Sequence, residues 1–259
     1  MKRFLSLSLL LLIGLQACGV LPAPAATTTP APTATPLPTS TLLPTETPTL
    51  APTSTPDKTA TAAADAAQVS DSIRKELDDL LGDTEIPYED GHLAWKQGKP
   101  LRVSLKGPSW DYVEIDQDLV EKNFILKSDV TWEASGIIIC GVIFRSEDDL
   151  EKGKQYKFSY LRLSGLPAWA IEVFEFGQFK NSPTKTQYSN SMNQGNGATN
   201  QVALVAQDEQ FTLFINRVRQ GRYFDNSKQR MDGTFAFHGS QDSGEGTCDF
   251  ENSWVWALE

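Results

Sequence analysis

Residues 123–132 of the chain read NFILKSDVTW, and the alternation within this stretch decides the fold. Apolar side chains recur at every second position and share one face, while polar side chains share the other. The apolar face holds Phe124, Leu126, Val130 and Trp132, and the polar face holds Lys127, Asp129 and Thr131. A period of two is typical of an antiparallel strand with one face in a core and one in water. The stretch therefore predicts a half-buried β-strand.

The same alternation continues on the C-terminal side, where turn-rich runs such as residues 188–200 separate the segments. The further predicted strands are residues 157–163, 170–176, 201–207, 210–216, 233–237 and 249–258. No long amphipathic helix follows residue 82. Residues 84–259 have the size of one domain with its own core, and many short strands predict an all-β sandwich or barrel.

A helix is predicted on the N-terminal side, over residues 59–82. Large apolar residues are spaced near 3.6 positions in its second half, and Gly82 is placed to end it. These apolar residues are Val69, Ile73, Leu77, Leu80 and Leu81. The second half can dock on the domain, and the apolar stripe is too short for a self-associating coil.

The first eighteen residues, MKRFLSLSLLLLIGLQAC, have the pattern of an export signal, with Lys2 and Arg3 before a short apolar segment. The ending LQAC resembles the lipobox of bacterial lipoproteins. This resemblance implies that Cys18 becomes an acylated N-terminus and that a lipid anchors the mature protein to a membrane at the cell surface. The alternative is an ordinary cleaved signal with an incidental cysteine.

Residues 19–58 are dominated by Thr, Pro and Ala without apolar periodicity, which predicts a disordered, extended linker. At ~3.1 Å per residue such a linker would reach on the order of 100 Å. Removal of Lys2 and Arg3 leaves 21 of the 23 basic residues against 33 acidic ones, a net charge of −12. Because so acidic a chain repels phosphate backbones, nucleic acid is not an expected partner.

The succession of strand patterns from NFILKSDVTW through CGVIFRSEDD, YKFSYLRLSG and QVALVAQDEQFTLFIN to DFENSWVWAL resembles the concanavalin A-like lectin/glucanase superfold in its laminin G-like form. The resemblance covers residues 91–259. The chain is similar in particular to Chloroflexi-type surface lipoproteins in which such a domain follows a Thr/Pro-rich tether. The resemblance implies a jelly-roll sandwich of two antiparallel sheets whose first and last strands are neighbours.

Two cysteines follow the one in the signal, and each shares its parity with apolar neighbours. Cys140 lies on the same strand face as Ile138, Val142 and Phe144. Cys248 lies on the same strand face as Phe250, Trp254 and Trp256. An exported compartment permits oxidation, so we expect a Cys140–Cys248 disulfide, with two buried free thiols as the alternative. Two cysteines and two histidines give no zinc spacing, and His238 is expected at the surface.

The string EIDQD superficially resembles the catalytic strand of laminarinase-type glycosidases in this superfold, because Glu114, Asp116 and Asp118 would share one face of a strand. Retaining hydrolysis needs two carboxyl groups ~5 to 5.5 Å apart. The string precedes the early strand and carries a shorter Asp118 at its third position, so no catalytic residues are predicted. We expect these acids on an exposed edge or loop.

Aromatic rings on a concave sheet face stack against pyranose rings, so carbohydrate binding is the expected role. Trp169, at a loop-to-strand junction, and Tyr160 are the predicted ligand-binding residues, although strand aromatics commonly belong to the core. Further candidates are Trp110, Tyr112, Phe174 and Phe176. No cofactor is predicted. Calcium is an alternative, since Asp242, Glu245, Asp249 and Glu251 gather near the C-terminus, but such acids are more often simply solvated and no EF-hand spacing is present.

The sequence therefore predicts a membrane-anchored, extracytoplasmic recognition module for carbohydrate or another envelope polymer. A structural or protein-contact domain without a small ligand is the alternative, and a glycoside hydrolase is a more distant one. An exposed aromatic platform on the concave sheet would favour recognition, and a face filled by Phe and Leu would favour the structural role.

Overall fold

The computed structural model describes residues 58–163, 166–226 and 230–259. The predicted signal, the anchor at Cys18 and the linker up to residue 57 lie outside the described residues. Within the described ranges, no helix is long and apolar enough to cross a membrane.

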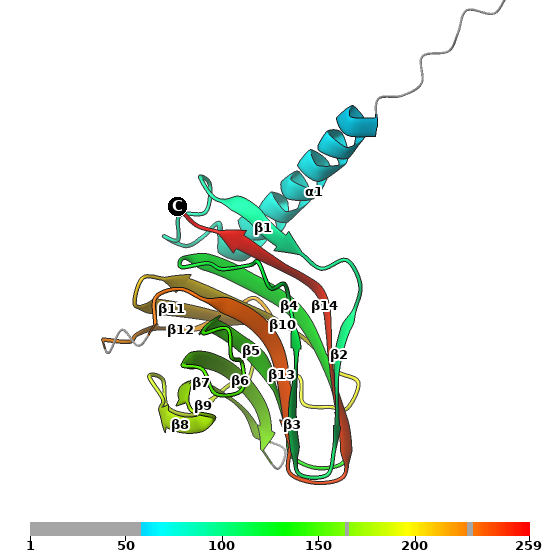
Figure 1. Cartoon of the computed structure of the whole chain (residues 1–259), viewed down its shortest axis with the longest axis vertical. Coiled ribbons are helices and arrows are strands. Elements are labelled where there is room, and N and C mark those ends of the chain that lie inside the picture. Colours follow the sequence, from blue (N-terminus) through cyan, green and yellow to red (C-terminus); the bar gives the residue numbers. More distant parts are fainter. Residues whose placement is uncertain (1–57, 164–165, 227–229) are drawn as a thin grey trace, which may run out of the picture. The chain divides into compact units, whose positions relative to one another are not determined.

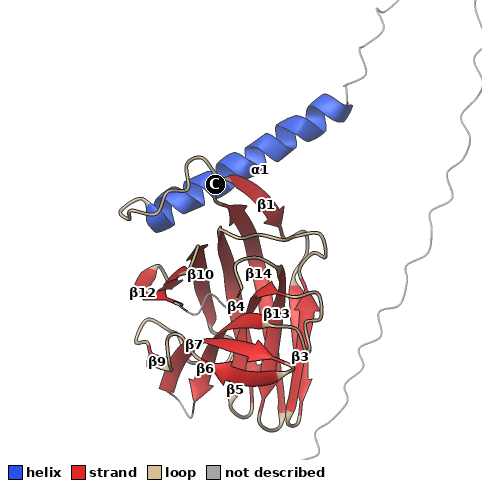
Figure 2. Cartoon of the chain, turned by 60° about the vertical axis from the view of Figure 1, so that its left-hand side comes forward, coloured by secondary structure: helices blue, strands red, loops and turns tan. Residues whose placement is uncertain are grey.

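The helix α1 spans Lys58–Leu81 and ends where the sequence predicted. The amide of Gly82 still donates to the carbonyl of Asp78 at 2.9 Å, whereas Thr84 already donates to Leu81 in a tighter turn. Figures 1 and 2 show the N-terminal half of the helix projecting beyond the strands, and its described residues from 62 to 68 are exposed.

Two antiparallel sheets follow the helix. Sheet A consists of β1 (His92–Lys96), β2 (Leu101–Lys106), β4 (Phe124–Ala134), β10 (Thr199–Gln207), β11 (Gln210–Ile215), β12 (Val218–Phe224) and β14 (Glu245–Ala257). Sheet B consists of β3 (Ser109–Glu114), β5 (Ile138–Ser146), β6 (Gln155–Leu163), β7 (Leu166–Glu175), β8 (Gln178–Asn181), β9 (Gln187–Tyr188) and β13 (Thr234–Gln241).

The strand order confirms the predicted two-sheet antiparallel sandwich (Figure 1). Sheet A runs β1-β14-β4-β10-β11-β12, with β2 also paired to β14. Sheet B runs β3-β13-β5-β6-β7-β8, with β9 paired to β7. The first strand pairs with the last, His92 lying opposite Ala257, as the resemblance implied.

The core lies between the two sheets and follows the alternation of the sequence. The apolar positions predicted for NFILKSDVTW all point into it, and Phe124, Leu126, Val130 and Trp132 are buried there. Sheet B contributes the matching positions of its own strands, among them Val142, Phe158, Ile171 and Phe237.

The outer face of sheet A is covered by the second half of α1. Ile73, Leu77 and Leu81 pack against Ile125 and Trp254 in a second apolar cluster. The helix also hydrogen-bonds to the sheet, since the indole of Trp254 donates to Glu76 at 3.0 Å. Helix and sandwich therefore share one apolar cluster.

This cover changes the environment of Lys127, which the alternation predicted on a solvated face. Lys127 lies on the outer face of sheet A, as predicted, but the residue is 4% exposed. Its ammonium lies 3.0 Å from the carboxylate of Asp129 and donates to the carbonyl of Asn252 at 3.2 Å. Lys127 is thus a buried lysine whose charge is compensated.

Candidate functional site

Both residues predicted to bind sugar lie in the core. Trp169 of β7 is 1% exposed, Tyr160 of β6 is fully buried, and the two are register partners. Their rings pack among Phe158, Trp132 and Tyr223. In this structure neither ring offers a free face for stacking, because the parity of both positions directs them between the sheets. The surface role expected of them is therefore corrected to a role in the core.

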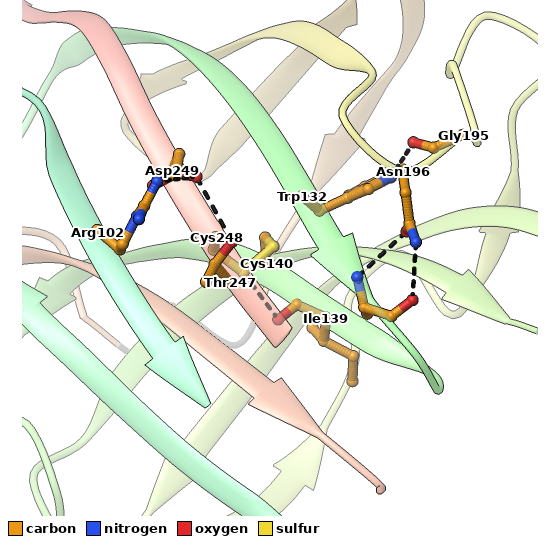
Figure 3. Close-up of a disulfide and its surroundings, with 10 residues drawn as sticks. Arg102, Trp132, Ile139, Cys140, Gly195, Asn196, Thr247, Cys248 and Asp249 are labelled. Carbon is orange, nitrogen blue, oxygen red and sulfur yellow. Dashed lines mark hydrogen bonds and ion pairs between the residues drawn. A yellow bond between two sulfur atoms is a disulfide. The ribbon is translucent and has the colours of Figure 1, made fainter. Parts of the chain in front are cut away.

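The predicted disulfide is confirmed. Cys140 of β5 and Cys248 of β14 are bonded, with Cα atoms 5.8 Å apart, and they join sheet B to sheet A (Figure 3). Both side chains are buried in the core, as their parity predicted. Because 108 positions separate the two cysteines, the bond constrains much of the unfolded chain.

The acids near the C-terminus are engaged separately. Asp249 forms an ion pair with Arg102, shown in Figure 3, and Asp242 accepts a hydrogen bond from the amide of Ile137 at 2.8 Å. Glu245 lies 3.4 Å from the ammonium of Lys106. Within the part of the chain that the structure describes, no three His, Cys, Asp or Glu side chains gather in a way that could hold a metal.

The acids of EIDQD lie at an edge, as expected. Glu114 is the last residue of β3, an edge strand, and Asp116 and Asp118 follow in an exposed turn. The carboxylate of Asp116 accepts from the amide of Asp118 at 3.0 Å, which bends the chain. Since the strand stops at Glu114, the alternation that would place all three acids on one face stops there too.

The outer face of sheet B carries a different set of side chains. The ammonium of Lys157 on β6 lies 4.3 Å from the ring centroid of Trp110 on β3 and 4.3 Å from that of Phe174 on β7. The two centroids are therefore no more than 8.6 Å apart, although four strand spacings, ~19 Å in a flat sheet, separate β3 from β7. This face is therefore concave, with its side chains converging over the middle.

We call this surface the concave face. It is formed by Trp110, Tyr112, Lys157, Ser159, Glu172, Phe174 and His238, with Phe179 at its rim. Trp110 is 36% exposed and Phe179 is 54% exposed, whereas Lys157 is only 6% exposed. A cation held between two rings gains about 0.5 to 2 kcal/mol from their quadrupoles.

His238 lies under this arrangement, which corrects its predicted surface position. Its parity does direct it away from the core, because the neighbouring Phe237 points inward. His238 of β13 and Gly141 of β5 are register partners. They lie between the strand carrying Lys157 and the strand carrying Trp110, so the lysine side chain passes over them to reach the ring. The imidazole lies over Gly141, and His238 is 2% exposed. Neither ring nitrogen has a hydrogen-bond partner among the residues that the structure describes.

Burial shifts the ionisation of all three titratable groups in the middle of the face. It lowers the pKa of Lys157 to about 8, against the opposing effect of Glu172. It raises the pKa of Glu172, whose carboxylate accepts a hydrogen bond from Ser159 at 3.2 Å. Burial, followed by the charge of Lys157, holds the pKa of His238 well below its usual range. Such a group of perturbed residues is typical of a functional site.

Two depressions lie elsewhere, at the end of the sandwich around Ser135. They have volumes of about 570 and 670 Å³ and are lined mainly by polar residues of strand ends and turns. Arg162, at the second of them, donates to the carbonyls of Ala134 and Gly136 and to the side chain of Asn196. These hydrogen bonds hold this end of the fold together, and they occupy the guanidinium of Arg162 within the chain.

The aromatic candidates of the sequence identified part of the concave face. Trp110, Tyr112 and Phe174 were candidates, and the structure brings all three to one surface, while the fourth, Phe176, lies exposed in the turn after β7. Lys157 and Glu172 were not predicted. Their signal is that they are charged residues at outward positions of two neighbouring strands, a signal shared by many solvated residues.

No protein-family model and no curated protein matches this chain. Among solved structures, it is similar to the carbohydrate-binding module CBM66 from Bacillus subtilis, with 13% identity over 60% of this chain and 94% of that one and a TM-score of 0.41. It is also similar to the Bacillus licheniformis β-glucanase, with 9% identity over 62% and 79% and a TM-score of 0.44. Sheep galectin-11 shares 10% identity over 56% and 98%, with a TM-score of 0.36. Nothing about binding follows from similarity at this level.

Proposed function

We propose that the sandwich is a recognition module that binds carbohydrate or another polymer of the cell envelope on the concave face of sheet B. The observation that carries the proposal is that exposed rings and buried polar groups converge there. Trp110 offers an exposed ring for stacking, and Lys157 with Glu172 can orient hydroxyl or charged groups.

The contrast between the two outer faces supports recognition over a purely structural role. The outer face of sheet A is filled by Ile125, Phe214 and Trp254 beneath α1. The concave face of sheet B carries aromatic and charged side chains, and only a small apolar cluster of the described residues, Ile143, Leu150 and Ala236, packs beside its Tyr112. The larger apolar filling therefore lies on the side on which the helix packs.

The proposal places the domain outside the cytoplasm, held to a membrane by an acyl chain on Cys18 and by the linker predicted over residues 19–58. The Cys140–Cys248 disulfide supports an oxidising compartment. Replacement of Cys18 by Ser is expected to release the protein from the detergent phase. Unchanged partitioning of that variant would refute the anchor.

The proposal includes no hydrolytic activity. This part of the proposal is supported by the position of Glu114 at the end of an edge strand, with Asp116 and Asp118 in the turn beyond it. A β-glucan incubated with the purified protein is expected to stay intact. Cleavage that is lost in Glu114→Gln would replace recognition by catalysis.

A glycan array probed with the full-length protein in detergent tests the recognition role. Wild type is expected to bind a subset of glycans, and Trp110→Ala is expected to lose that binding. Phe224→Ala is the matched control, because Phe224 is a 55% exposed ring on β12 of the other sheet. A folded protein that binds no glycan and no envelope polymer would favour the structural role.

A further inference from the structure

Among the described residues, Lys157 differs from the other buried lysine, Lys127, in forming no ion pair and no hydrogen bond. Lys127 is 4% exposed and is compensated by Asp129 and the carbonyl of Asn252. Lys157 is 6% exposed, and no residue of the described ranges hydrogen-bonds to its ammonium or forms an ion pair with it within 4.0 Å. Buried charges are normally paired, so an uncompensated one requires an explanation.

The rings beside Lys157 hold the ammonium without satisfying its donors. Trp110 and Phe174 attract its charge through their faces but offer no lone pairs to its three N–H groups. Glu172, the nearest acid on the register, accepts a hydrogen bond from Ser159 instead. The arrangement fixes the position of a cation and leaves its hydrogen-bonding capacity free.

His238 adds a second unsatisfied group on the same face. Both of its ring nitrogens are buried and unpartnered, and a neutral imidazole presents one N–H donor and one acceptor. Unsatisfied polar atoms in a buried position are rare in native structures, and each requires an explanation. Lys157 and His238 together make the concave face rich in unused donors.

We infer that the polymer recognised on the concave face is anionic and that the ammonium of Lys157 binds a carboxylate or sulfate group of its sugar units. This inference rests on the proposed function, because it names the class of ligand for that same face. General basicity does not account for it: the chain carries 33 acidic residues against 23 basic ones. Attraction of an anion to this protein has to come from a local cation, and Lys157 is positioned between two rings of the concave face.

The affinity is expected to depend on pH through Lys157. The titratable groups on the same face are Glu172 of β7, His238 of β13, and Tyr112 and Glu114 of β3, whereas β5 presents Gly141 and Ile143 there. The carboxylates of a uronate polymer stay ionised above pH 6, while Lys157, with a pKa of about 8, loses its proton. Binding should therefore weaken between pH 7 and 9.

The test is calorimetric titration of the full-length protein in detergent with polygalacturonate, its fully methyl-esterified form and neutral dextran. We expect polygalacturonate to bind at least tenfold more tightly than the ester, and Lys157→Met to abolish this preference. Lys127→Met is the matched control and should retain it. A loss of affinity of at least tenfold from pH 7 to pH 9 in wild type gives a readout that does not depend on the folding of any variant.

The outcomes separate the two proposals. Equal binding of polygalacturonate and its ester, with sensitivity to Trp110→Ala, would overturn the anionic class and leave carbohydrate recognition standing. A preference for the acid that Lys157→Met leaves unchanged, or that does not decline up to pH 9, would assign the anion to another group. Failure to bind any of the three polymers, together with an empty glycan array, would overturn both.

Discussion

The ammonium of Lys157 lies 4.3 Å from the ring centroid of Trp110, although β13 and β5 separate the strands that carry these residues. The lysine side chain thus spans neighbouring strands to reach a ring at the sheet edge and ends in a position that excludes most water. Such an arrangement favours binding and opposes stability, because a desolvated charge is retained in the free protein.

Replacement of Lys157 by Met is expected to stabilise the domain by about 2 kcal/mol at pH 7, since an apolar side chain of similar length removes the desolvated charge. The direction in which the stability of wild type changes with pH follows from the same pKa. The folded state releases its proton near pH 8 and the unfolded state near 10.5, so the unfolded state binds more protons between these values and stability rises there with pH.

Urea denaturation from pH 6 to 10.5 measures both effects of Lys157. Lys127→Met serves as the control and should lower the free energy of unfolding by about 1 to 2 kcal/mol, because Asp129 and a carbonyl lose their donor. A Lys157→Met variant less stable than wild type at pH 7 would show that the cation contributes to folding.

His238 is expected to make the fold acid-sensitive. Its pKa in the folded state is held well below the ordinary value of 6.5 by burial, so below pH 6.5 the unfolded state binds a proton that the folded state does not. Stability should fall by up to about 1.4 kcal/mol per pH unit below that value. His238→Leu should remove this slope in thermal melts between pH 4.5 and 7, and an unchanged slope would assign the sensitivity to other groups.

Reduction of the Cys140–Cys248 bond should lower the free energy of unfolding by about 2 to 5 kcal/mol, chiefly through the unfolded chain. The comparison is wild type against a Cys140→Ala, Cys248→Ala double variant in urea. Equal stabilities would show that the two strands are held as well by packing alone.

Leu77→Ala in α1 is expected to cost about 2 to 4 kcal/mol, because this fully buried side chain fills the cluster over Ile125 and Trp254. Lys75→Ala, at an exposed position of the same helix, is the control. If both variants melt with wild type, α1 does not contribute to the stability of the sandwich.

Alternation along the sequence was sufficient to predict β4, β6, β7, β10, β11, β13 and β14 and the inward position of both cysteines, and Gly82 marked the end of the helix at Leu81. The strands β1 to β3, β8, β9 and β12 were not predicted. It could not separate Trp169 from Trp110 as the ring that faces a ligand, because burial depends on which side of a sheet another layer covers. The convergence of Trp110, Lys157 and Phe174 depends on the curvature of sheet B across several strands. His238 was placed at the surface for the same reason, since its parity was read correctly while the side chains above it were unknown.

The most direct test of the central claim is carbene footprinting of the full-length protein with and without a glycan selected on the array. The account predicts reduced labelling of Trp110 and Phe179 on the concave face, with Phe224 on the other sheet labelled as before. These three side chains are exposed enough in the free protein, between 36% and 55%, for labelling to report their protection. Protection of Phe224 alone, or equal labelling of Trp110 in the free and bound protein, would contradict recognition on this face.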